Sequence, residues 1–164
     1  MIRNTIVALA GLALLAGCGG NEAEGEKKSE MASVRDLMKD EVQPTAEIYW
    51  GSAGSVSDEN GMTDLTPTTD EGWQKTRDSA VKLGELGKKL MEPQYSKDRG
   101  EGWIRLSQGL IDVSKIAEQA AADKNPDKVF EVGGTIYDVC TACHQAYPQS
   151  EAPSAEGDGT AAAG

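Results

Sequence analysis

The stretch from Asn125 to Tyr147 constrains the fold of this 164-residue chain more than any other. Asn125-Pro126 has the form of a helix start, because asparagine caps a first turn and proline suits a position that needs no N–H donor. Apolar residues then recur every three or four positions as far as Tyr147, which predicts a helix with one buried face. Cys140 and Cys143 lie on that face.

Three earlier stretches show the same periodicity, and none shows convincing strand alternation. The second of the four helices is expected to open with a Thr-X-X-Glu capping box at Thr68 and Glu71, and Pro44 is expected to kink the first. Four helices with mostly short connections predict an all-α fold, an up-down-up-down four-helix bundle. The segment 51–67 is rich in Gly, Ser, Asp and Thr, and it is interpreted as a surface insertion in preference to a functional cover.

The two ends of the chain are expected to lie outside this domain. Residues 1–17 combine Arg3 with an apolar run of 11 residues, too short to span a bilayer. Leu15-Ala16-Gly17-Cys18 resembles a bacterial lipobox, which implies cleavage before Cys18 and acylation of that residue. Residues 18–28 then form a flexible tether, residues 29–147 the folded domain, and residues 148–164 a disordered tail.

The charge of the chain excludes one class of partner. A net charge of −11 and a pI near 4.5 do not match the clustered Lys and Arg of a nucleic-acid-binding surface. A protein partner steered by charge would instead present a basic patch.

The motif Cys140-Thr141-Ala142-Cys143-His144 uses the only histidine of the chain, and three chemistries suit it. A structural zinc site would need a carboxylate as fourth ligand. A dithiol redox centre would need the cysteines at a helix N-terminus, whereas these approach a C-terminus. Cys-X-X-Cys-His is also the attachment signature of a c-type haem, in which both thiols bond to one porphyrin edge and the adjacent imidazole reaches the iron. The sequence favours covalent haem.

With this motif in the last of four helices, the chain resembles the cytochrome c-prime family and its low-spin, six-coordinate relatives. The segments that carry the resemblance are "FEVGGTIYDVCTACHQAY" and, more weakly, "VRDLMKDEVQPTAEIYW". The resemblance implies one haem near the end of the last helix, bound through Cys140 and Cys143, with His144 as proximal ligand. Members often carry a basic residue soon after the motif, whereas Pro148-Gln149-Ser150 stands there in this chain.

The sixth iron position decides between two functions. In an antiparallel bundle the start of the first helix lies beside the end of the fourth, so Met31 and Met38 are the candidates, and the resemblance to six-coordinate relatives favours Met38. His/Met ligation predicts a carrier of single electrons between redox partners. An empty distal side would instead predict binding of nitric oxide or carbon monoxide, as in five-coordinate family members.

Taken with the leader, these features predict a lipid-anchored c-type cytochrome that faces the periplasm of a bacterial cell envelope, with the outer membrane favoured over the inner. An enzyme is not expected, because the chain offers no second histidine and no nucleophile and base at recognisable spacing. The sequence leaves a homodimer open.

Overall fold

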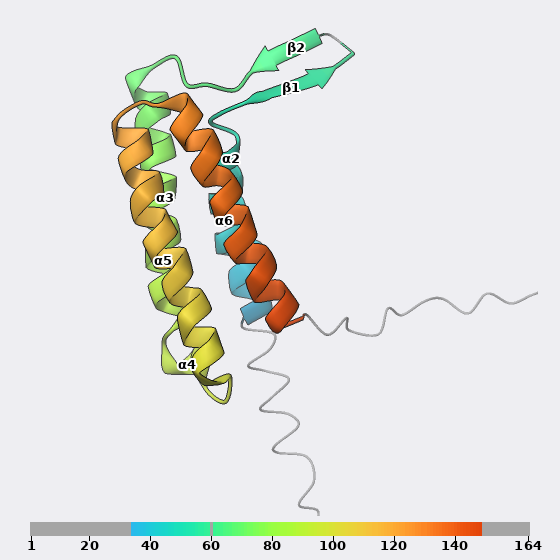
Figure 1. Cartoon of the computed structure of the whole chain (residues 1–164), viewed down its shortest axis with the longest axis vertical. Helices are drawn as coiled ribbons and strands as arrows, with labels where there is room; N and C mark the ends of the chain where they lie inside the picture. Colours follow the sequence, from blue (N-terminus) through green and yellow to red (C-terminus); the bar gives the residue numbers. More distant parts are fainter. Residues whose placement is uncertain (1–33, 60, 149–164) are drawn as a thin grey trace, which may run out of the picture.

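The computed structural model describes residues 34–59 and 61–148. This part of the chain is mostly helical, with one small antiparallel sheet (Figure 1). The prediction of an all-α fold is therefore broadly confirmed. Cys18 and Met31 lie outside the described residues.

The first helical segment runs without a break from residue 34 to residue 50, but its hydrogen bonding changes on the way. Residues 34–37 are α-helical, η1 (Met38–Val42) is a π-helix, and α2 (Gln43–Trp50) is α-helical again. The Gln43 N–H donates to the carbonyl of Met38, five residues back. Proline cannot donate such a bond, so the irregularity expected at Pro44 takes the form of a π-helical turn just before it.

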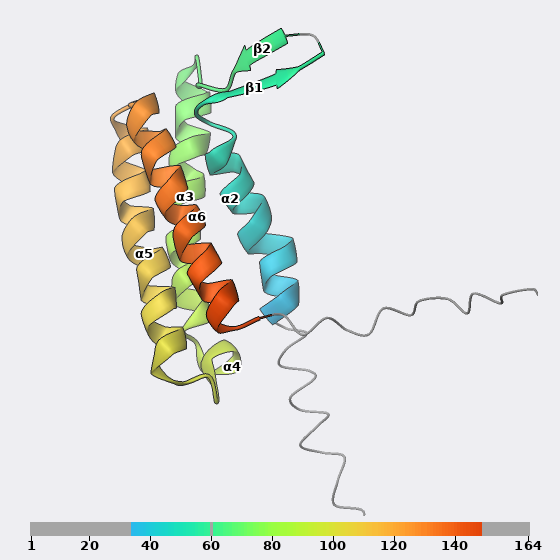
Figure 2. The same ribbon diagram turned by 45° about the vertical axis from the view of Figure 1, so that its right-hand side comes forward.

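The other long helices are α3 (Asp70–Leu90), α5 (Gly100–Ala122) and α6 (Pro126–Ala146), with a single turn, α4 (Pro93–Ser96), between the first two. Consecutive long segments run in opposite directions, and the start of the first lies at the same end of the molecule as the end of α6 (Figures 1 and 2). α3 packs against α2 and α5, and α6 packs against α5 and, over a short stretch, α2.

The helix starts follow the expected capping chemistry, with one correction. Asn125 caps α6 as predicted, its side-chain oxygen accepting from the Lys128 N–H at 3.0 Å. The expected capping box of Thr68 and Glu71 is wrong by one residue. Thr69 is the cap of α3, and its hydroxyl accepts from the Gly72 N–H at 3.1 Å.

The segment 51–67, which the sequence indicates as a surface insertion, contains two strands that were not predicted. β1 (Ser55–Asp58) and β2 (Gly61–Asp64) pair in an antiparallel hairpin that projects beyond the helices (Figure 1). Every strand residue is exposed, so no alternation of apolar and polar residues marks the strands in the sequence. Alternation develops only where one face of a sheet is buried.

The core lies between α3, α5, the inner face of α6 and the first helical segment. Small residues let α3 and α5 approach closely: a Cβ on Gly87 would lie 2.7 Å from Ile111 Cγ1 and 3.1 Å from the Ser107 carbonyl oxygen. Large buried side chains fill the rest, namely Tyr49, Leu83, Leu86, Ile136 and Val129. None of the helices in the described part of the chain has the length and apolarity needed to cross a membrane.

Candidate cofactor-binding site

The Cys-X-X-Cys-His motif occupies the last turns of α6. Cys140 and Cys143 are half-buried, pack against the hydrophobic core and are not joined in a disulfide. His144, which follows directly, is exposed. Helical spacing thus places both thiols against the core, whereas the imidazole of His144 is on the exposed side.

The environment of the thiols opposes thiolate chemistry. Burial raises the pKa of Cys140, and the neighbouring Cys143 raises it further. Burial also raises the pKa of Cys143, although the positive charge of Arg99 acts in the opposite direction. A dithiol oxidoreductase needs a thiol with a lowered pKa, so the local electrostatics do not favour that alternative.

Arg99 belongs to an aromatic cluster that ties the end of α6 to the start of α5. Its guanidinium lies 4.5 Å from the ring centroid of Trp103, and its carbonyl accepts a 2.9 Å hydrogen bond from the Tyr147 hydroxyl. The rings of Trp103 and Tyr147 meet edge to face at 5.1 Å. No sequence signal marks Arg99, because only the fold brings it near Cys143.

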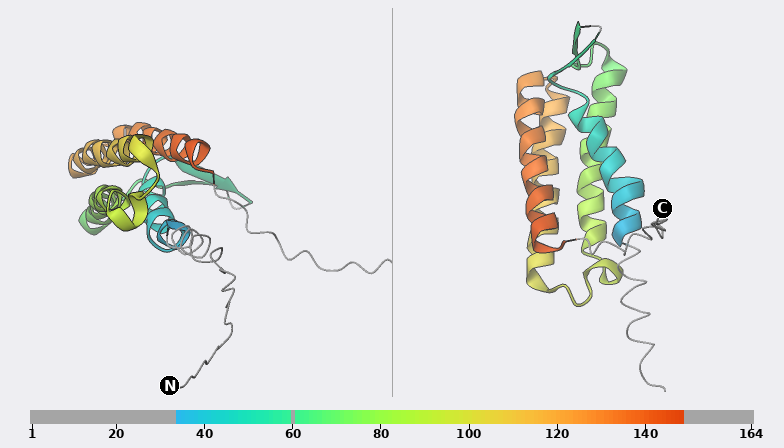
Figure 3. Two further views of the ribbon diagram at one scale, coloured as in Figure 1. Left: turned by 90° about the horizontal axis from the view of Figure 1, so that it is seen from below. Right: turned by 90° about the vertical axis from the view of Figure 1, so that its right-hand side faces the viewer.

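Met38 lies at the start of η1 and is half-buried against the core. Its helix begins at the end of the molecule where α6 ends, as seen in two further orientations (Figure 3). The fold thus brings Met38 to the end of the molecule that carries the motif. Its neighbours Arg35 and Lys39 are exposed.

Gly133 and Gly134, one to two turns before Cys140, differ in their surroundings. A Cβ on Gly133 would lie 3.3 Å from the Trp50 ring, and the Trp50 indole N–H donates to the Gly133 carbonyl at 2.9 Å. A neighbouring helix therefore approaches at Gly133. At Gly134, nothing lies within 4 Å of an added Cβ.

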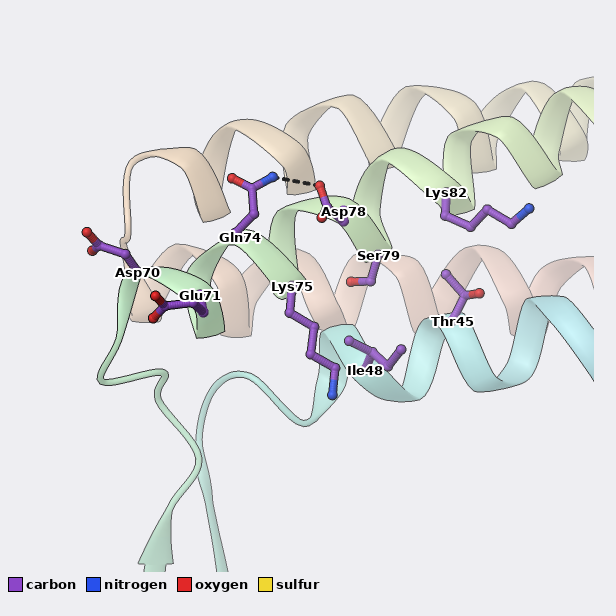
Figure 4. A pocket seen from close by; sticks show the side chains of 9 residues that line it. All are labelled: Thr45, Ile48, Asp70, Glu71, Gln74, Lys75, Asp78, Ser79 and Lys82. Atoms are coloured by element: carbon purple, nitrogen blue, oxygen red, sulfur yellow. Dashed lines mark hydrogen bonds between the residues drawn. The ribbon is translucent and has the colours of Figure 1, made fainter.

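An open groove of about 650 Å³ lies between α2 and α3, away from the motif. Its polar groups do not converge on one point (Figure 4). Gln74 donates to Asp78 at 2.7 Å, and Lys82 pairs with Glu41 at 3.2 Å. The groove contains none of the residues that the sequence predicts for the site.

We also searched for a cluster of side chains that could bind a metal ion directly. Among residues 34–59 and 61–148, no group of three or more His, Cys, Asp or Glu side chains is placed to hold a metal ion.

Comparisons with protein-family models, with curated proteins and with solved structures found no match to this chain.

Proposed function

We propose that this protein is a c-type cytochrome that transfers single electrons, with one haem bound covalently at the end of α6. One observation carries the proposal. At one end of the molecule lie two unpaired, half-buried thiols, the only histidine and a half-buried methionine from another helix. This set contains two thiols that could form thioether bonds to a porphyrin, an imidazole for one side of the iron and a methionine thioether for the other, so the chemistry of the residues fits the group.

Each residue has a distinct role in the proposal. The Cys140 and Cys143 sulfurs hold the porphyrin through thioether bonds, and their raised pKa values keep them protonated until those bonds form. His144 provides the proximal nitrogen and Met38 the distal sulfur. When bound, the haem supplies an iron that changes charge by one electron, and a methionine opposite histidine raises its potential relative to weaker axial fields.

The fold that this proposal implies is an up-down-up-down four-helix bundle. The order of packing supports it, since α3 lies between α2 and α5, and α6 returns to α2. Cofactor sites in such bundles are built from side chains on facing helices. Here the facing helices are α6 and the first segment, which begins with residues 34–37 and the π-helical turn η1. Short π-helical insertions occur frequently at functional sites.

The first test is the visible spectrum of the reduced, haem-matured protein before and after addition of carbon monoxide. A low-spin spectrum that the gas leaves unchanged is expected, as is haem that stays with the polypeptide on denaturation. Cys140→Ser and Cys143→Ser together should abolish that retention. Lack of covalent haem in the unmodified protein would overturn the proposal.

Met38→Leu tests the sixth ligand, with Met62→Leu in the exposed hairpin as the matched control. The variant of Met38 should become high-spin and bind carbon monoxide, whereas the control should not change. A wild-type protein that already binds the gas would favour the second candidate function, the binding of nitric oxide or carbon monoxide. If Met31 is the sixth ligand instead, Met31→Leu and not Met38→Leu should become high-spin and bind carbon monoxide.

We also propose that a lipid on Cys18 anchors the protein to a bacterial membrane, preferably the outer one, facing the periplasm. The lipobox-like sequence and the short apolar run before it support this proposal. Metabolic labelling with a fatty acid should mark the unmodified protein and leave a Cys18→Ser variant unlabelled. A label retained by the variant would contradict the anchor.

A further inference from the structure

An apolar groove of about 290 Å³ lies between α2 and α6, beside the root of the hairpin. Four aromatic residues line it: the buried Tyr49, and Trp50, Phe130 and Tyr137. Phe130 is the only phenylalanine of the chain, yet 67% of it is exposed, and Tyr137 is 61% exposed. Large exposed apolar groups that gather in one place commonly mark an interaction surface.

The groove is built to remain open. Trp50 is fixed by its hydrogen bond to the Gly133 carbonyl, and its ring meets that of Tyr137 edge to face at 6.3 Å. Gly134 leaves open space between Phe130 and Tyr137. These aromatic rings therefore present faces and edges to whatever lies outside the groove.

The charges around the groove are mostly acidic. Residues 43–64, which span α2 and the hairpin, contain four Asp and Glu and no Lys or Arg. No Lys or Arg follows Lys128 anywhere in the chain. The wall formed by α6 from Val129 onward carries Glu131, which pairs with Lys128 at 2.9 Å, and Asp138. The last of these carboxylates lies next to Tyr137.

We infer that this aromatic groove, with its acidic surroundings, is the docking surface for a basic protein that exchanges electrons with this one. Lys and Arg side chains of such a partner would meet acidic groups at the border and aromatic ring faces within, where cation–π attraction adds to charge attraction. Tyr137 lies one turn before Cys140 on α6, so a partner seated here would be adjacent to the proposed haem. The inference rests on the proposed function and specifies its partner.

The test uses the full haem-matured chain and, as probe, a soluble, strongly basic mitochondrial-type cytochrome c. Binding is measured by calorimetry at low ionic strength and electron exchange by stopped-flow absorbance. The double variant Phe130→Ser/Tyr137→Ser should weaken binding about tenfold and slow exchange. The matched control Val81→Ser/Ile116→Ser removes exposed apolar residues from α3 and α5 and should change binding less than about twofold, a surface effect.

Charge is tested separately. Asp138→Asn, beside the groove, should weaken binding more than Asp112→Asn on α5, although both remove one carboxylate. Equal losses of binding in the two Asp→Asn variants would show attraction to the overall negative charge. Equal losses in the two double variants would show a general effect of the surface, and either result would overturn the docking site. The sedimentation of the unmodified protein is also compared with that of the Tyr137→Ser variant. A slower-sedimenting variant would overturn the docking site, because the groove would then be an interface between two copies of this chain.

Failure of the two proposals can be told apart. Absence of covalent haem would eliminate electron exchange and the proposed function, while calorimetry would still report whether the groove binds the basic probe. Normal haem with equal binding by both double variants would remove the docking site alone.

Discussion

The contact between α3 and α5 and the contact between α2 and α6 show how differently one small domain can pack its helices. α3 and α5 pack along most of their length, and small residues such as Gly87 and Ser107 bring their backbones close together. α2 meets α6 over a short stretch, chiefly where Trp50 covers Gly133. The first contact has the dense packing of a protein interior, and the second does not.

The features on which the proposals rest lie on the first helical segment and on α6. They are the π-helical turn, the half-buried Met38, the two free thiols and the exposed aromatic rings. On the other side, the buried hydroxyls of α3 and α5 are satisfied by their own helices, as when Ser114 donates to the Leu110 carbonyl at 2.7 Å. We therefore expect the contact between α3 and α5 to contribute most of the stability, and α6 and the first helical segment to form the proposed haem site.

The largest effect should follow from a cavity in the tightly packed pair. Leu83 on α3 is fully buried, so Leu83→Ala should lower the free energy of unfolding by about 3 kcal/mol in urea. Met38→Ala, in the haem-free protein, should cost about 1 kcal/mol or less, because Met38 is only half-buried and its surroundings can adjust. Similar losses at the two positions would remove the proposed contrast.

Two glycine substitutions should have opposite signs. An alanine Cβ at Gly87 would collide with Ile111 and with backbone atoms of α5, so Gly87→Ala should destabilise the protein by roughly 2 kcal/mol. Gly134→Ala meets open space and should stabilise α6 by up to about 1 kcal/mol through helix propensity. Thermal unfolding of both variants checks the signs, and a loss at Gly134 would mean that α6 is closely covered there.

This contrast could be predicted from the sequence only in part. Apolar periodicity and the Asn125-Pro126 start located the helices, because both are local signals. The hairpin was missed because its residues bury no face, and the dipeptide Asn60-Gly61 was its one hairpin-type turn signal. Nothing in the sequence distinguishes Gly87, at a close helix contact, from Gly134, beside open space.

In the candidate site, too, the sequence predicts what depends on local spacing and does not predict contacts between helices. Cys140, Cys143 and His144 are close in sequence, so helical geometry alone places them together. Arg99 and the aromatic cluster of Trp103 and Tyr147 depend on how α5 and α6 meet, which periodicity does not specify. The same holds for the groove that joins Trp50 to Tyr137.

The reactivity of the thiols tests the electrostatics of the α6 end. Burial raises the pKa of both Cys140 and Cys143, so less thiolate is present at neutral pH and alkylation of the haem-free protein should be severalfold slower than that of a free thiol. Arg99→Gln should slow Cys143 further and leave Cys140 almost unchanged, whereas Arg77→Gln, which is paired with Glu118 elsewhere, should affect neither. Mass spectrometry of the alkylated peptides gives both rates. Fast alkylation of either thiol would contradict a raised pKa and would favour the dithiol redox centre.

The smallest effect concerns the ion pairs that hold the first helical segment to α3. Glu41 accepts from Lys89 at 2.6 Å and pairs with Lys82 at 3.2 Å, and these lysines lower its pKa, Lys89 most. Because the pKa is lower in the folded protein than the ordinary value of 4.5, the stabilisation is complete above that value and is lost as the pH falls through the folded pKa.

Glu41→Gln should therefore cost well under about 1 kcal/mol at neutral pH, since the pair is partly exposed. The difference between the variant and the unmodified protein should disappear in acid and shrink with added salt. Urea unfolding at several pH values measures it, with Glu118→Gln, at the Arg77 pair between α3 and α5, as the control. A difference that persists in strong acid would mean that Glu41 acts through packing, and that the first helical segment is held more firmly than its short contact with α6 indicates.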